Sequence, residues 1–227
     1  MNLPVKIRVK QVKKEMLFEA YKHKEVLTYC QRCNNYGKNY SCPDFFFDTV
    51  AYLEPYKYAT IILTEVDTQQ IQMQWHQLDP NQLDSRVRSN YLMEEPDQKL
   101  DMKSIVSMYA FENIKNQMAD QLLALETKID DSVGLPPGSC TKCATCRKSL
   151  GEPCRFPETL RYSLEALGFL VSGIYKQLFD LELAWSKDEL PTSFCSCSAL
   201  MTKEKCDEII ILESLEGMVL RINEVGV

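Results

Sequence analysis

The chain has 227 residues, 45% of them hydrophobic and 26% charged, with a formal net charge of −6. This is ordinary globular composition, and the acidic balance argues against binding to nucleic acid or to an anionic membrane surface. The N-terminus has no apolar run of signal-peptide length, and no stretch approaches the roughly 20 apolar residues that span a bilayer, so we expect a soluble, cytoplasmic protein.

Residues 4–12 are predicted to form a strand at the edge of a sheet. Val5, Ile7 and Val9 alternate with lysine and arginine, which is the pattern of a half-exposed strand whose charges discourage further pairing. The next segment, residues 15–27, is ambiguous between helix and strand.

The first group of cysteines lies in a loop at residues 30–43, which reads C-Q-R-C-N-N-Y-G-K-N-Y-S-C-P. Cys30 and Cys33 form a C-x2-C pair, which supplies two metal ligands from one turn, and Cys42 precedes Pro43. A redox thiol pair or a structural knuckle without metal is the alternative. Because only three thiols are local, a metal here takes a fourth ligand from elsewhere or keeps one position open for substrate. The candidates for that fourth ligand are Cys195, Cys197 and Cys206.

Between the cysteine loops, the clearest strand is the β-branched run from Tyr58 to Val66. A short helix is predicted before it, at residues 45–54, beginning near Asp48. After it, apolar residues alternate with glutamines at 71–75, so the strand is expected to continue or pair there. Residues 101–129 predict the longest helix, because apolar side chains recur every three or four positions and form a core-facing stripe.

The second group of cysteines lies in a loop at residues 138–157. Cys140, Cys143 and Cys146 are each separated by two residues, and Cys154 follows after seven more. Bacterial-type iron–sulfur proteins use the same tight C-x2-C-x2-C run, whereas structural zinc sites usually take their thiolates as two separated pairs. We therefore predict a [4Fe–4S] cluster on these four thiols, with zinc as the alternative.

The surroundings of the second loop fit an anionic cluster. A four-thiolate [4Fe–4S]2+ site has a net charge of about −2, which the protein must offset. Pro157 is placed to begin a helix that Gly168 ends, and the amide end of this helix would point toward the sulfurs. Five basic residues lie in or beside the loop: Lys142, Arg147, Lys148, Arg155 and Arg161.

The C-terminal part is predicted to alternate strands with one helix. Residues 169–171 suggest a short strand, residues 172–179 a helix, and residues 180–200 further strands. On such a strand Cys195 and Cys197 share a face and are interpreted as small buried residues. Cys206 lies among charged residues and is expected to be exposed. Residues 209–222 predict a final hairpin that bends at Gly217.

Both cysteine loops resemble the DUF2284 family of predicted metal-binding proteins. The first loop is similar to C-x2-C-x2-Y-G-K-x-W-x-C-P-P, with Tyr40 in place of the tryptophan and Asp44 in place of the second proline. The second is similar to G-x-C-x2-C-x2-C-x7-C-R-x-P-E with a following S-x-E-A-x-G. The resemblance implies metal binding and no established reaction. The resemblance also implies which residues are the metal ligands: Cys30, Cys33, Cys42, Cys140, Cys143, Cys146 and Cys154.

We expect one α+β domain over residues 1–227, with a mixed sheet of about five or six strands covered by the long helix and the shorter ones. Three functions stay open. The chain holds one or two [4Fe–4S] clusters for electron transfer or for a partner enzyme; or it is an iron–sulfur enzyme with an open metal position at Cys30, Cys33 and Cys42; or it is a structural zinc protein. The expected partner is a redox protein or a small-molecule substrate.

Overall fold

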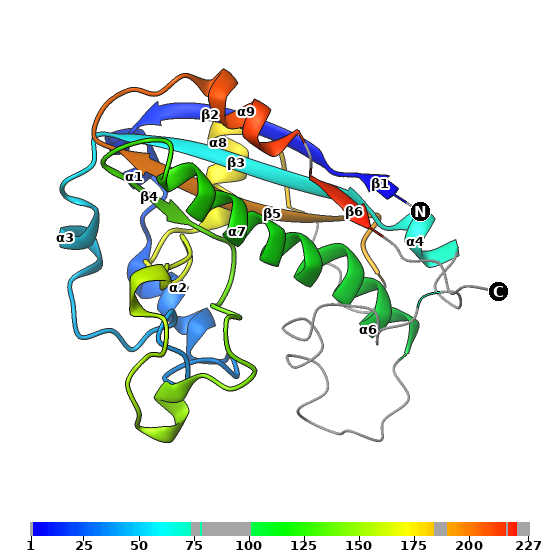
Figure 1. Ribbon diagram of the computed structural model, residues 1–227, viewed down its shortest axis with the longest axis horizontal. Helices are drawn as coiled ribbons and strands as arrows, with labels where there is room; N and C mark the ends of the chain where they lie inside the picture. The colour runs from blue at the N-terminus through cyan, green and yellow to red at the C-terminus, as the bar shows by residue number, and fades with distance from the viewer. Residues whose placement is uncertain (1, 74–77, 79–100, 184–189, 217, 222–227) are drawn as a thin grey trace.

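The computed structural model of the chain describes residues 2–73, 78, 101–183, 190–216 and 218–221. Its centre is a four-stranded antiparallel sheet in the order β2-β3-β5-β4. The strands are β2 (Lys6–Lys13), β3 (Tyr58–Asp67), β5 (Ser193–Thr202) and β4 (Ser132–Leu135). A separate two-stranded sheet pairs β1 (Asn2–Pro4) with β6 (Val219–Arg221) beyond the end of the main sheet (Figure 1).

The combination of helices and strands is as predicted, but the expected mixed sheet of five or six strands is wrong. The main sheet has four strands, and every described strand pair is antiparallel. The edge position of β2 and the strand at Tyr58–Asp67 are confirmed. Of the further strands expected at residues 180–200, only β5 forms among the described residues, and 184–189 lie outside them.

Two segments expected to be strands are helices. α4 (Gln69–Met73) occupies most of the alternating segment at 71–75, whose last two residues lie outside the described chain. α9 (Glu208–Leu215) replaces the first arm of the predicted hairpin. Asp207 caps α9 by accepting a hydrogen bond from the Ile209 N–H at 2.9 Å. This cap, together with burial of one helical face, outweighs the strand preference of the isoleucines.

One face of the sheet is covered by the long helix, which is confirmed. It consists of α6 (Met102–Ser107), a π-helical turn (Met108–Glu112) and α7 (Asn113–Glu126). Asp101 caps its start by accepting from the Ser104 N–H at 2.7 Å. Its apolar stripe and α9 pack on one set of alternating sheet residues, which includes Ile62 and Leu200.

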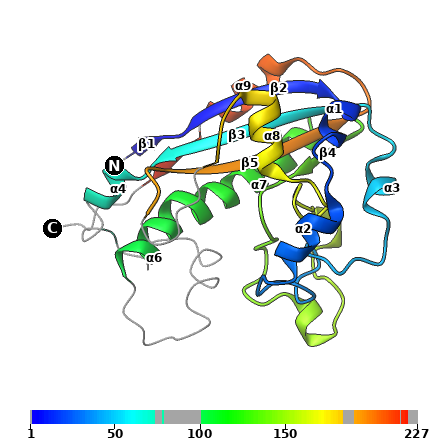
Figure 2. The ribbon, with the colours of Figure 1, turned by 180° about the vertical axis from the view of Figure 1, so that it is seen from behind.

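The opposite face is covered by α1 (Lys14–Phe18) and α8 (Val171–Phe179), as Figure 2 shows from behind. The side chains beneath them are the other alternating set, including Ile61, Leu63 and Ala199. The segment from Leu164 to Phe169 adds further buried residues to this layer. None of the described helices is long and apolar enough to cross a membrane.

Two shorter helices lead into and out of the first cysteine loop. α2 (His23–Cys30) ends at Cys30, so the ambiguous segment 15–27 is helical except for a turn between α1 and α2. α3 (Thr49–Leu53) follows the loop, and Asp48 caps it through the N–H groups of Val50 and Ala51, as predicted.

Candidate metal centre

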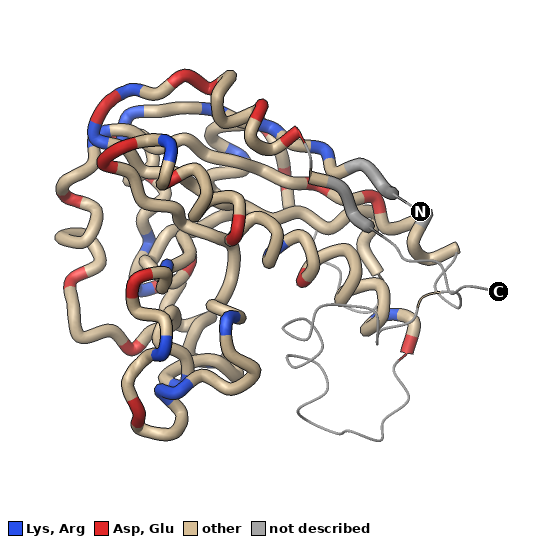
Figure 3. The backbone as a smooth tube through the Cα atoms, viewed as in Figure 1, with Lys and Arg blue, Asp and Glu red and all other residues tan. Residues whose placement is uncertain are grey.

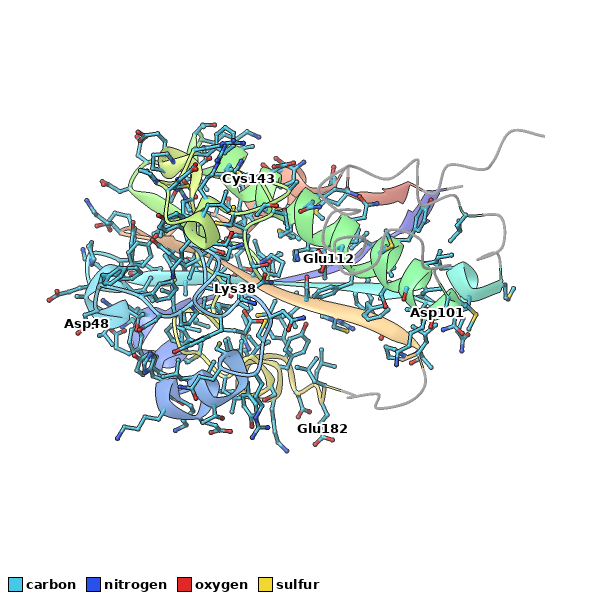
Figure 4. The ribbon with its side chains drawn as sticks, turned by 90° about the horizontal axis from the view of Figure 1, so that it is seen from below. Lys38, Asp48, Asp101, Glu112, Cys143 and Glu182 are labelled. Atoms are coloured by element: carbon cyan, nitrogen blue, oxygen red, sulfur yellow. The ribbon has the colours of Figure 1, made fainter. Side chains whose placement is uncertain are left out.

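The two cysteine loops lie against each other at one end of the sheet. Ser41 Oγ accepts a hydrogen bond from the Cys140 N–H at 2.7 Å, and Asn39 Nδ2 donates to the Cys140 carbonyl at 3.0 Å. Tyr40 Oη donates to the Glu152 carbonyl at 2.8 Å. Figure 4 views this end from below and labels Lys38 on the first loop and Cys143 on the second. Residues about a hundred positions apart therefore form one bonded unit.

The four cysteines of the second loop line a single pocket. Cys140, Cys143, Cys146 and Cys154 contribute to its wall, with Asn39 and Tyr40 from the first loop. Burial raises the pKa of Cys140, and the nearby Cys146 and Cys154 raise it further. Among the described residues, no three His, Cys, Asp or Glu side chains lie close enough together to hold one metal ion. The four sulfurs are thus spread around the pocket wall.

Backbone N–H groups point at two of these sulfurs. The Tyr40 N–H donates to Cys146 Sγ at 3.4 Å, and the Phe156 N–H donates to Cys154 Sγ at 3.4 Å. The helix predicted from Pro157 to Gly168 is wrong, because only one 3-10 turn forms, at Pro157–Thr159. The amide donors that were expected from a helix end come from the two loops instead.

Several basic residues lie on the two cysteine loops of an otherwise acidic chain (Figure 3). Residues 30–44 and 138–157 together carry a net charge of +4, which leaves −10 on the rest of the chain. Lys142, Arg147 and Arg155 line the pocket, and Lys148 Nζ donates to the Asp44 carbonyl at 3.1 Å. Arg161 is bound by Glu126 in a half-buried ion pair. Arg147 is likewise paired, with Glu152, so Lys142 and Arg155 are the lining cations for which no carboxylate partner is found among the described residues.

The three cysteines of the first loop form a second group. Cys30 and Cys33 lie in one turn, in which the Cys33 N–H donates a hydrogen bond to the Cys30 carbonyl at 2.9 Å. Burial raises the pKa of Cys42 to about 11, and the charges of Cys33 and Cys30 contribute to the rise. The pKa of Cys30 is raised by burial, then by Cys33 and then by Glu165. The three thiols therefore influence one another electrostatically.

The last three cysteines lie elsewhere. Cys197 is buried on the sheet face under α1 and α8, and Cys195 packs against the same core. Cys206 packs on the opposite face, where its Sγ lies 2.8 Å from Gln11 Nε2 and 3.5 Å from Thr60 Oγ1. Cys206 is half-buried, so its expected full exposure is wrong.

Sequence reasoning missed three residues that shape this region. Asn39 and Ser41 hold the second loop, and the charge of Glu165 contributes to the raised pKa of Cys30. The resemblance in the S-x-E-A-x-G stretch included Glu165, but it suggested no role for this residue. Nothing in the sequence indicated what Ser41 would bind, because its partner lies 99 residues further along the chain.

The residues present fit an iron–sulfur cluster. Thiolates are the ligands such clusters use, and hydrogen bonds to the sulfurs help to set their potential. The pocket supplies four thiols, two N–H donors to sulfur and a basic wall. The first loop adds a second set of three thiols.

Comparison with known families agrees with a metal centre. The model of DUF2284, described as a predicted metal-binding protein, matches residues 19–202, which include both cysteine loops. No curated protein and no solved structure matches the chain.

Proposed function

Because the chain belongs to the DUF2284 family of predicted metal-binding proteins, we propose that it is an iron–sulfur protein that transfers electrons. Cys140, Cys143, Cys146 and Cys154 would hold a [4Fe–4S] cluster. Cys30, Cys33 and Cys42 would hold a second metal centre. The partner would be a redox protein or an enzyme that receives the electrons.

The observation that carries this proposal is the convergence of four thiols on one pocket, where loop amides donate to two of the sulfurs. A zinc ion with four thiolates at about 2.3 Å needs the sulfurs in a tight tetrahedron. A four-iron cube is a larger object, so its sulfur ligands stand further apart. The three closely spaced thiols in one loop, with the fourth following, favour the cube over a zinc ion.

The protein's part in the chemistry follows from the groups around the pocket. When bound, the cluster supplies reversible one-electron chemistry. The N–H groups of Tyr40 and Phe156 stabilise negative charge on the sulfurs. Lys142, Arg147 and Arg155 offset the charge that remains. Partial exposure of the loop keeps the cluster within reach of a partner that docks on this end.

An iron–sulfur enzyme is the second candidate, favoured by the first loop. It carries three thiols in one loop, and Cys206, one candidate for a fourth ligand, lies on the other side of the sheet. A centre with one position free would act on a small substrate as a Lewis acid or redox site. The two functions differ in what occupies that position.

Metal analysis of anaerobically purified protein tests the proposal. We expect a brown protein with iron and acid-labile sulfide, and loss of about four irons per chain in Cys143→Ser, because one cube contains four irons. Cys206→Ser is the matched control, since it removes a thiol outside both loops and should keep the full iron content. A colourless protein that holds only zinc after iron-replete expression would contradict the proposal.

A further inference from the structure

We propose that the two cysteine loops form a docking surface for an acidic redox protein. This surface, here called the loop face, consists of residues 30–46 and 138–157. The inference rests on the proposed function and deepens it, because it states the chemistry of the electron-transfer partner. The partner that fits is compact and negatively charged where it touches the loops.

The first observation is the uneven distribution of charge along the chain. The loop face carries a net charge of +4, and the remaining residues carry −10. A four-thiolate [4Fe–4S]2+ cluster brings about −2 and a second cluster on three thiolates about −1, so the loop face stays positive with both bound. Opposite charges on facing surfaces speed and orient association, and like charges disfavour wrong contacts. An acidic partner would therefore be repelled by most of this chain and attracted to the loop face.

The second observation is that cations of the loop face are accessible. Arg32, Lys38 and Arg155 are exposed, and Lys142 is partly exposed at the wall of the cysteine pocket. None of these four side chains has a carboxylate partner among the residues that the structure describes. Carboxylates of a partner protein would supply the missing counter-charges.

The third observation is a set of exposed apolar side chains among these cations. Phe46 is fully exposed, and Leu150 and Phe156 are 57% and 47% exposed. The rings on either side of Phe46, those of Phe45 and Phe47, stack on each other with centroids 4.8 Å apart, which anchors the backbone that presents Phe46. Aromatic anchors surrounded by polar groups are typical of the centre of a protein interface.

Hydrogen bonds between the loops join these groups into one surface. Lys148 Nζ donates to the Asp44 carbonyl at 3.1 Å, which links the end of the first loop to the 3-10 turn at Arg147–Leu150. Arg155 and Phe156 line the cysteine pocket itself. A protein that docks on the loop face is therefore placed directly over the proposed cluster site, as electron transfer requires.

A nucleic acid fits the loop face less well than an acidic protein does. It is an extended polyanion, and its affinity comes from many phosphates paired with lysine and arginine. A strand that occupied the loop face would continue along surfaces of a chain that carries −10 outside it. A compact protein can touch the loop face alone.

The test measures the affinity of the full chain for a fluorescently labelled plant-type [2Fe–2S] ferredoxin, used as a compact acidic probe, by fluorescence anisotropy. Salt at about 10 mM and about 150 mM shortens the Debye length from about 30 Å to about 8 Å, so we expect the affinity to fall about tenfold. Arg32→Glu and Lys38→Glu, both outside the pocket wall, should each weaken binding at least about threefold at low salt. Phe46→Ser should weaken binding at both salt concentrations. Lys205→Glu is the matched control, because it makes the same charge change at an exposed residue between β5 and α9, and it should bind like wild type.

Absence of binding at low salt, equal affinity at the two salt concentrations, or charge reversals that bind like Lys205→Glu would overturn the docking surface. Tighter binding of a single-stranded DNA of about 20 bases would overturn the choice of a protein partner. The proposed function is judged separately, because the affinity measurement needs no electron transfer. A chain that binds the probe as expected but lacks iron and sulfide keeps the docking surface and loses the proposed function. An iron–sulfur protein that does not bind the probe gives the reverse result.

Discussion

Gly168 combines a left-handed backbone conformation with close neighbours, so it tolerates a side chain poorly. Its φ is +102°, and an added Cβ would lie 2.8 Å from His23 Cδ2 and 3.1 Å from His23 Cα. We expect Gly168→Ala to lower the free energy of unfolding by about 2–4 kcal/mol, because both backbone strain and overlap must be relieved. Chemical denaturation measures this.

Gly173 is the matched control for that substitution. It lies in α8 with ordinary backbone angles, and an added Cβ would meet Ala20 Cβ at a normal 3.7 Å. Alanine is favoured over glycine inside a helix, so Gly173→Ala should raise stability by about 0.5–1 kcal/mol. Equal effects of the two substitutions would show that the contact with His23 is unimportant.

Cys197 gives a second prediction at the level of single residues. It is buried, and burial raises the pKa of its thiol well above the usual value. The reactive thiolate is therefore scarce at pH 8 in the folded chain and becomes abundant only on unfolding. Iodoacetamide followed by peptide mass spectrometry should label Cys206 at least tenfold faster than Cys197 in native protein. Comparable labelling rates would contradict the core position of Cys197.

Residue chemistry was predictable where it depended on local spacing. The C-x2-C-x2-C run and the following Cys154 indicated four thiols around one centre, and the structure places these four around one pocket. The hydrogen bond from the Cys140 N–H to Ser41 was not predictable, since a serine has no spacing rule that names a distant partner. Arg161 is a case in which nearness in sequence misled. Its position beside the second loop suggested that it offsets the charge of a cluster, but its side chain is paired with Glu126 in α7.

Among the elements, α9 depends most on a single cap. It has eight residues and begins at the cap Asp207, and it places Ile211 and Leu215 in the core. Asp207→Ala should destabilise the protein by about 1 kcal/mol, because loss of an N-cap costs this much. Glu213→Gln, exposed on the same helix, should change stability by less than about 0.5 kcal/mol. Thermal unfolding of both variants decides this, and an unchanged midpoint for Asp207→Ala would be the contrary result.

Element prediction succeeded where the pattern was long and failed where it was short. The stripe over residues 101–129 extends over many turns, so a π-helical turn at Met108–Glu112 did not disturb it. Residues 209–212 form a run of four apolar residues, which fits a strand or a buried helix equally well. The Asp207 cap decided between them, and its effect depends on packing against the sheet.

At the scale of the whole molecule, the sheet acts as a platform that carries both cysteine loops at one end. β3 and β5 pair over ten residues, α2 ends in the first loop, and β4 leads into the second (Figures 1 and 2). The contact between the two loops could not be predicted from the sequence, because it is made by hydrogen bonds between residues far apart along the chain. The uneven charge, +4 on the loop residues against −10 elsewhere, was countable from sequence, but its concentration around one pocket required the fold.

Because the two cysteine loops are hydrogen-bonded to each other, we expect loss of the second-loop metal centre to loosen the first loop. Tyr40 donates its N–H to Cys146 Sγ, and Ser41 holds the Cys140 N–H. Cys143→Ser should therefore expose the amides of residues 39–42 to hydrogen exchange about tenfold faster, which corresponds to about 1.4 kcal/mol, the scale of one hydrogen bond. Amides of β3 should exchange at the wild-type rate, because the sheet does not depend on the cluster. If exchange at residues 39–42 stays at the wild-type rate while the second-loop cluster is absent, the loops are independent. A uniform increase that includes β3 would instead show global destabilisation.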